Sequence, residues 1–429
     1  MSRSPAETRA LVERSLRRRY WAERRFRAYG LLAVLVGISF VFVLFGSIVS
    51  KGYTAFRQAY LTLEIHYDPA VLRPEGVTGP EALAGANYNT LVRNALRELF
   101  PEVTGRAELR QLSQLVSNSA AHQLQQHLMA HPELVGQREK QRFLAGADVD
   151  QLLKGAIDRK AGEASRVLSD QQLGWVDTLE KKAGLKLEFN TGFLTNGDSR
   201  EPEQAGVGGA LMGSIYTLLV TLLLSFPIGV AAAVYLEEFA RRGRWTDIIE
   251  VNINNLAAVP SIVFGLLGLA VFLNFFGLPR SAPLVGGLVL TLLTLPTIII
   301  ASRAALKGVP PSIREAALGM GASKLQMVAH HVLPLAMPGM LTGTIIGMAR
   351  ALGETAPLLM IGMVAFIVDI PRGITDPATV LPVQIFLWAD SPERAFIERT
   401  SAAILVLLAF LIVMNGVAVI LRKRFERRW

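Results

Sequence analysis

The stretch "VPPSIREAALGMGASKLQMVAHHVLP", Val309 to Pro334, lies between two long apolar runs and carries several helix signals in close succession. Pro310 and Pro311 stop the preceding helix, because proline lacks the amide hydrogen that helix continuation needs. Ser312 followed three residues later by Glu315 matches a capping box, in which each side chain covers an unpaired amide at the helix start. The pattern therefore predicts a short helix with Ser312 as its N-cap.

The remainder of this stretch predicts a second short helix. Gly319 and Gly321 weaken the first helix, and Pro334 is expected to end the second. Ala316 and Ala317 are small residues that could serve as contact positions. Two interpretations are open here: a capped surface helix, or a docking element for another protein.

The chain as a whole has the composition of a membrane protein. Of its 429 residues 51% are hydrophobic and none is cysteine, which excludes disulfides, thiolate metal sites and cysteine nucleophiles. A membrane-spanning helix needs about 20 apolar residues. Six runs reach this length, and together they predict six transmembrane helices: Ala28–Ser50, Gln204–Leu236, Val251–Pro279, Ser281–Ser302, Leu335–Val368 and Thr400–Leu421. The first run is too long and too charged in front for a usual cleaved signal, so we expect it to be retained.

The charges are unevenly distributed along the chain. Residues 51–203 carry 18 Lys/Arg against 20 Asp/Glu, whereas the whole chain has a net charge of +9. Basic clusters precede Tyr29 and follow Leu421, and both adjoin apolar runs, which favours a membrane surface over nucleic acid. Short basic segments mark the cytoplasmic side. We therefore expect both termini inside and the long segment between the first two helices outside.

This long segment has the patterning of a folded domain. Residues 60–67, "YLTLEIHY", alternate like a half-buried strand, and residues 185–189, "LKLEF", could pair with them. Helical periods fall between the two, around residues 87–100, 108–130, 148–160 and 165–183. The segment predicts a small α+β domain, and the helical periods disfavour a disordered loop.

Two charged residues interrupt the fifth apolar run. Arg350 and Glu354 each cost roughly 2.5–3.5 kcal/mol at the centre of a membrane helix, and their spacing places them on one helix face. Pro357 cannot donate to the carbonyl of Gly353, so we expect the helix to loosen around Glu354. Counting from Pro338, Arg350 lies about 18 Å along the helix, near the middle of the membrane. A guanidinium group there could bind an oxyanion in a pathway, or the two charges could form a structural pair.

Several motifs together carry a family resemblance. The order Glu315-Ala316-Ala317, Gly321 and Leu333-Pro334 resembles the EAA loop of ABC importer permeases, although His331 replaces a usual branched aliphatic residue. The segments "VPSIVFGLLGLAVF" (259–272), "LTLPTIIIASRAALKGVPPSIREAALGMGASK" (293–324), "ARALGETAPLL" (349–359) and "LPVQIFLWADSP" (381–392) resemble the PstA-type permease of the phosphate ABC importer. The similarity covers about residue 208 to the C-terminus.

This resemblance implies a multi-pass protein of the bacterial inner membrane with several partners. It implies a heterodimer with a PstC-type permease, a dimer of PstB-type ATPases, a periplasmic phosphate-binding protein and contact with membrane lipid, but not with nucleic acid. ATP and Mg would be bound by the ATPase, because this chain has no phosphate-binding loop. No cofactor, metal site or enzymatic activity is expected in the chain itself.

The resemblance also suggests a role for individual residues. Arg350, Glu354 and, with weaker support, Thr355 would lie in the substrate pathway. Glu315, Ala316, Ala317 and Gly321 would couple to the ATPase. We expect helix breaks at Pro334, Pro338 and Pro357.

The expected organisation divides the chain into five segments. These are a basic cytoplasmic tail (1–28), the first transmembrane helix (29–50), an inserted periplasmic domain (51–206), the permease core with helices two to six and a coupling loop at 308–334 (207–421), and a second basic tail (422–429). The alternatives are a permease for sulfate or molybdate, and a membrane sensor that does not transport.

Overall fold

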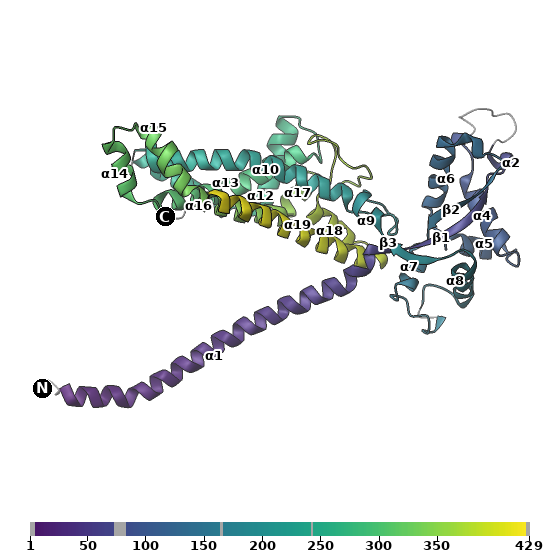
Figure 1. Ribbon diagram of the computed structural model, residues 1–429, viewed down its shortest axis with the longest axis horizontal. Coiled ribbons are helices and arrows are strands. Elements are labelled where there is room, and N and C mark those ends of the chain that lie inside the picture. The colour runs from purple at the N-terminus through teal and green to yellow at the C-terminus, as the bar shows by residue number, and fades with distance from the viewer. Residues whose placement is uncertain (1–4, 73–82, 164–165, 242, 426–429) are drawn as a thin grey trace. The chain divides into compact units, whose positions relative to one another are not determined.

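The long apolar runs form the longest helices of the computed structural model, which describes residues 5–72, 83–163, 166–241 and 243–425 (Figure 1). Within these residues, five helical segments are long and apolar enough to cross a membrane: Ser15–Phe56, Gly208–Phe239, Pro283–Lys307, Lys324–Gly353 and Ala395–Arg424. A sixth span results if the bent pair Arg244–Ala257 and Ser261–Phe275 is counted as one. The structure thus has five to six membrane-capable helices where the sequence predicts six.

The helices and strands fall into two sets along the chain. The first contains α1 (Pro5–Gly52), η1 (Tyr53–Phe56), β1 (Arg57–His66), α2 (Pro69–Leu72), α4 (Tyr88–Leu99), α5 (Arg106–Ser113), α6 (Ser119–Ala130), η2 (Pro132–Leu134), β2 (Arg138–Leu144), α7 (Ala147–Leu153), α8 (Asp170–Lys182), β3 (Lys186–Phe189) and α9 (Thr191–Thr195). The second contains α10 (Gly208–Val234), η4 (Tyr235–Phe239), α11 (Arg244–Ala257), α12 (Ser261–Leu267), η5 (Gly268–Phe275), α13 (Pro283–Lys307), α14 (Pro311–Gly319), α15 (Lys324–Met327), η6 (Val328–Val332), α16 (Leu333–Gly353), α17 (Ala356–Met360), α18 (Leu381–Ala389) and α19 (Ala395–Phe425).

Residues 57–189, called the α+β region below, contain a three-stranded sheet of order β2-β1-β3. Both neighbours pair antiparallel to β1, with Leu63 opposite Gln141 and Tyr60 opposite Lys186. The predicted pairing of the first and last strand segments is therefore confirmed. The central position of β1 agrees with its apolar alternation, whereas the charged strand β2, "REKQRFL", lies at an edge and was not predicted.

The α+β region has its own apolar core. Leu61, Leu63 and Ile65 of β1 are buried and alternate with exposed residues, as a strand with one covered face requires. They pack with residues of α4, α5, α6, α7 and α8 into one cluster. The predicted helical stretch 108–130 forms two helices, α5 and α6, instead of one.

The third apolar run is not a straight helix. Its two halves, α11 and α12, are bent by 104° where Pro260 has an extended backbone. Proline has no amide hydrogen and disfavours a helical conformation in the residue before it, so the helix ends here. The sequence predicts one span over this run, and the structure forms it as a bent pair of helices.

The remaining long helices pack side by side. α10 contacts α13, α13 contacts α16, and α16 contacts α19 (Figure 1). Two apolar clusters fill this bundle, one around Val289 and Ala351 and the other around Leu306 and Val332.

Pro334 and Pro338 do not break the chain's helical path. Helical backbone runs from Lys324 to Gly353, so the predictions of a helix end at Pro334 and of a break at Pro338 are wrong. The π-helical segment η6 ends at Val332, two residues before Pro334. The wider π turn absorbs the clash between the proline ring and the carbonyl four residues earlier.

Candidate functional site

The charged pair of the fifth apolar run lies at the end of α16. Arg350 Nε donates to Glu354 Oε1 at 3.4 Å, and the Arg350 side chain is 54% exposed whereas that of Glu354 is 18% exposed. Met348, Ala351 and Leu352 of the same helix are buried in the bundle. Arg350 therefore lies on the face of α16 that this chain leaves uncovered.

The helix ends at this pair instead of continuing. α16 stops at Gly353, Glu354 has an extended backbone, and Thr355 precedes the short helix α17. Pro357 occupies the first turn of α17, where its missing amide costs nothing. Pro357 thus follows a helix break, as predicted, but the break lies upstream of the proline.

This break is packed against the preceding bent pair. A Cβ on Gly265 of α12 would lie 2.7 Å from Pro357 Cα, so the two backbones touch. Glycine is required at this contact, since even alanine would force the segments apart. The end of α16 and the start of α17 are consequently fixed by α12.

The loop that follows α13 forms the two short helices that the sequence predicts, but with different caps. α14 begins at Pro311 with Pro310 as an extended N-cap, and no side chain caps it. The expected capping box of Ser312 and Glu315 is wrong, because Pro311 is already suited to the first helical position. A capping box is present instead at α15, where Ser323 and Gln326 bond each other's backbone.

The coupling residues have different exposures. Glu315 and Ala316 are exposed, but Ala317 is buried at 2% exposure in the cluster around Leu306 and Val332, so the prediction that it forms a contact position is wrong. Gly321 has φ of +86°, a conformation that favours glycine, and ends the turn after α14. Large apolar side chains around it are exposed: Leu318, Met320 and Leu325.

Arg314 anchors α14 to the bundle, although the sequence pattern did not predict this role. Its Nη2 donates to Glu238 Oε1 of η4 at 2.7 Å and to the Leu306 carbonyl of α13 at 2.9 Å. Its Nη1 donates to the Val309 carbonyl at 2.7 Å. One side chain thus neutralises a buried carboxylate and adds a bond to the Leu306 carbonyl, which also accepts from the Val309 amide at the end of α13. The sequence around Arg314 could not indicate this ion pair, because Glu238 is 76 positions away in the chain.

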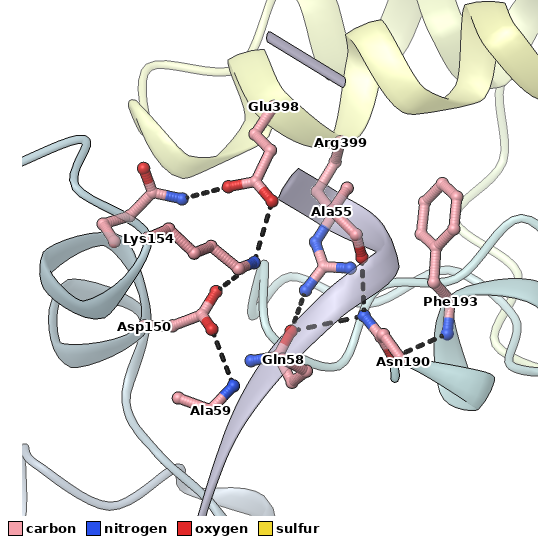
Figure 2. A network of polar contacts seen from close by, with 10 residues as sticks. Ala55, Gln58, Ala59, Asp150, Lys154, Asn190, Phe193, Glu398 and Arg399 are labelled. Atoms are coloured by element: carbon pink, nitrogen blue, oxygen red, sulfur yellow. Dashed lines mark hydrogen bonds and ion pairs between the residues drawn. The ribbon is translucent and has the colours of Figure 1, made fainter. Parts of the chain in front are cut away.

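A second polar network ties the α+β region to α19 (Figure 2). Lys154, the C-cap of α7, bonds Glu398 of α19 at 2.8 Å and Asp150 at 2.6 Å, and the Lys154 side chain is only 2% exposed. Asp150 in turn accepts from the backbone amide of Ala59 in β1 at 2.8 Å. Gln151 donates to the other oxygen of Glu398 at 2.5 Å.

The neighbouring residue of α19 bonds the start of β1. Arg399 donates to Gln58 Oε1, which also accepts from Asn190 at 3.3 Å (Figure 2). Gln58 departs from the alternation of β1, since it and Ala59 are both buried. Gln58 is buried where it bonds Arg399 of α19 and Asn190.

Two regions of this chain match known protein families. Residues 225–429 match the family described as "Binding-protein-dependent transport system inner membrane component", and residues 13–163 match "Domain of unknown function (DUF3333)". The phosphate transport system permease protein PstA 1 of Mycobacterium tuberculosis is 34% identical over 53% of this chain and 74% of its own length. The probable ABC transporter permease protein YqgI of Bacillus subtilis is 31% identical over 50% of this chain and 78% of its own length.

Solved structures give a more distant likeness. The methionine ABC transporter MetNI in an inward-facing conformation covers 52% of this chain and 95% of that chain, with a TM-score of 0.39 and 18% sequence identity.

Replacement of Arg314 by methionine should loosen α14. It leaves the Glu238 carboxylate buried without its partner, which costs about 3 kcal/mol, the low end for buried pairs. We expect faster cleavage of residues 308–334 by protease in detergent. The exposed Arg244→Met variant is the control, and equal cleavage rates in both variants would contradict the anchoring role.

Replacement of Lys154 by methionine should destabilise the junction between α7 and α19. The carboxylates of Asp150 and Glu398 would remain buried without a cation, at a cost of about 3–5 kcal/mol. We expect a lower thermal unfolding midpoint, with exposed Lys140→Met as the control. Adding Glu398→Met should restore some of the loss, because coupled residues are not additive. A simple sum of the two single effects would exclude direct coupling.

Proposed function

We propose that this chain, which belongs to the family of PstA-type permeases, is a transmembrane subunit of an ATP-driven phosphate importer. The observation that carries the proposal is the Arg350–Glu354 pair, a charged group in an apolar helix on a face that the chain itself does not cover. A guanidinium exposed to lipid would cost roughly 2.5–3.5 kcal/mol, so water, substrate or a second protein must meet it.

The uncovered face forms half of a pathway. Ile346, Arg350 and Gly353 are exposed at spacings of four and three residues, which aligns them along one side of α16. A related PstC-type permease supplies the other half. Arg350 binds the phosphate oxygens through its fork of donors, Glu354 orients Arg350, and Thr355 adds a hydroxyl at the helix break.

The short helices α14 and α15 couple the pathway to a dimer of PstB-type ATPases. Glu315 and Ala316 are exposed there beside Leu318, Met320 and Leu325, and an apolar surface of this kind suits a protein partner. ATP and Mg are bound by these partners. Gly321 acts by shaping the turn, and Ala317 acts from within the core.

The orientation follows from the short basic segments. Both termini and the loop with α14 and α15 lie in the cytoplasm, and the α+β region lies in the periplasm, where a phosphate-binding protein delivers the substrate. The chain resides in the bacterial inner membrane with lipid around its uncovered apolar surfaces.

Transport proceeds by alternating access. Closure of the ATPases on ATP moves α14 and α15, and the continuous helix from Lys324 to Gly353 transmits this movement to Arg350. The π segment η6 and the two prolines after it are the places where this helix bends most easily. The cavity then opens outward to receive phosphate, and ATP hydrolysis returns it to the cytoplasmic side.

Arg350→Gln should reduce uptake of radiolabelled phosphate by at least about tenfold, because a hydrogen bond to a charged group is worth about 1.5–3 kcal/mol. The measurement uses cells whose only high-affinity phosphate system contains this chain, at matched membrane levels. Arg280→Gln, which removes an exposed arginine before α13, should leave uptake unchanged.

Three other outcomes would change the proposal. Full uptake by Arg350→Gln would make the pair structural. Competition by sulfate or molybdate would assign the pathway to another oxyanion. Failure to recover an ATPase with the intact chain would favour a sensor that does not transport.

A further inference from the structure

Positive charge collects around a cavity of about 630 Å³ in the α+β region. Its lining includes Arg93 and Arg97 of α4 together with Arg106 and Arg110 of α5. Residues four apart lie on one helix face, and α4 packs against α5. The two arginine pairs therefore surround the same hollow, which we call the arginine pocket.

Within the parts of the chain that the structure describes, these four arginines have no acidic partner. Among the residues that the structure describes, no carboxylate oxygen lies within ion-pair distance of any of them, and the side chain of Arg93 makes only a weak bond of 3.4 Å to the Asn89 carbonyl. By contrast, Arg138 of the same region pairs with Glu98 at 3.1 Å. A shortage of acidic residues does not explain why Arg138 is paired and these four arginines are not, because residues 51–203 have more acidic than basic side chains.

All four arginines are exposed and solvated, but their like charges repel one another. Like charges four residues apart destabilise a helix by about 0.2–0.5 kcal/mol, and here two such pairs border one cavity. A concave surface with one sign of charge also concentrates the electric field and attracts counter-ions. A bound anion would relieve the repulsion and complete the charge balance.

The remaining lining is partly apolar, from Val92, Leu109, Val116 and Ala120, and partly polar. Ser117 donates to Glu203 Oε1 at 2.6 Å, and Asn118 donates to Glu201 Oε1 at 3.1 Å. Neither glutamate belongs to the lining of the cavity. Asn89 and Ser113 add further polar groups to the lining.

We propose that the arginine pocket binds a multiply charged phosphate compound. The guanidinium fork matches the oxygens of a phosphate group, and four of them suit more than one negative charge. The cavity volume falls within the range of about 300–1,000 Å³ that small-molecule sites occupy, which favours a small anion over the broad surface of an acidic protein. This inference is independent of the transport pathway at Arg350.

The test is calorimetric titration of the purified full-length protein in detergent with tripolyphosphate at low salt. The double variant Arg97→Gln/Arg106→Gln should bind at least tenfold more weakly. The matched control Arg138→Gln removes one charge from the same region, but from an existing ion pair, and should bind like the wild type. Thermal unfolding without ligand shows whether the double variant is folded. If it is not, the single variants Arg97→Gln and Arg106→Gln are titrated instead.

Each outcome decides the matter. Weaker binding in the pocket variants alone supports the proposal, and retained binding in Arg350→Gln separates the pocket from the pathway. Competition by orthophosphate then identifies a free phosphate source, and competition by vesicles of phosphatidic acid and phosphatidylcholine a lipid headgroup. The proposal is overturned if the wild type and the double variant bind tripolyphosphate equally, or if the wild type does not bind it. A pull-down with the phosphate-binding protein adds one more outcome. If the double variant no longer captures that protein and the wild type binds no tripolyphosphate, the arginines form a protein contact and the proposal is overturned.

Discussion

Charges that are removed from water must be paired, and the junctions of this structure depend on that constraint. Lys154 joins the α+β region to α19 because Asp150 and Glu398 both need a cation. Arg314 joins α14 to the bundle for the same reason, through Glu238. An unpaired buried ion costs several kcal/mol, so each network is compatible with only one arrangement of the elements that carry it. The α+β region and the short helix α14 are consequently held in defined positions.

The same constraint separates structural from functional charges. The cation of the α7–α19 junction is almost fully buried, whereas Arg350 is 54% exposed although it lies in an apolar helix. A structural pair satisfies both partners inside one chain. Arg350 is only partly satisfied by Glu354 and needs a further group from outside the chain, which fits a role at a pathway. The four arginines of α4 and α5 have no acidic partner among the described residues, but they are exposed to water, where we propose that a small anion binds them.

Several predictions of helix starts and ends from single residues failed, because the backbone nearby adopted a conformation that those predictions did not consider. Ser312 does not cap α14, because Pro311 already starts the helix one residue earlier. Pro334 does not end a helix, because η6 precedes it and widens the turn. The third apolar run has the length of one span but bends at Pro260, which the apolar pattern did not indicate. Each proline did alter the local helix. The conformation of the neighbouring backbone decided whether the proline began, bent or interrupted the helix.

The sequence by itself determined the membrane class, the apolar runs, the pairing of the strands around residues 60 and 187, and the spacing of Arg350 and Glu354. These features rest on short-range periodicity, which a linear chain displays directly. Only the tertiary structure decided that Ala317 is buried, that Arg350 lies on an uncovered face, and that four arginines share one hollow. It also brought Lys154 to Glu398, 244 positions away. Contacts of that kind depend on how separate elements pack, so they cannot be predicted from local patterns in the sequence.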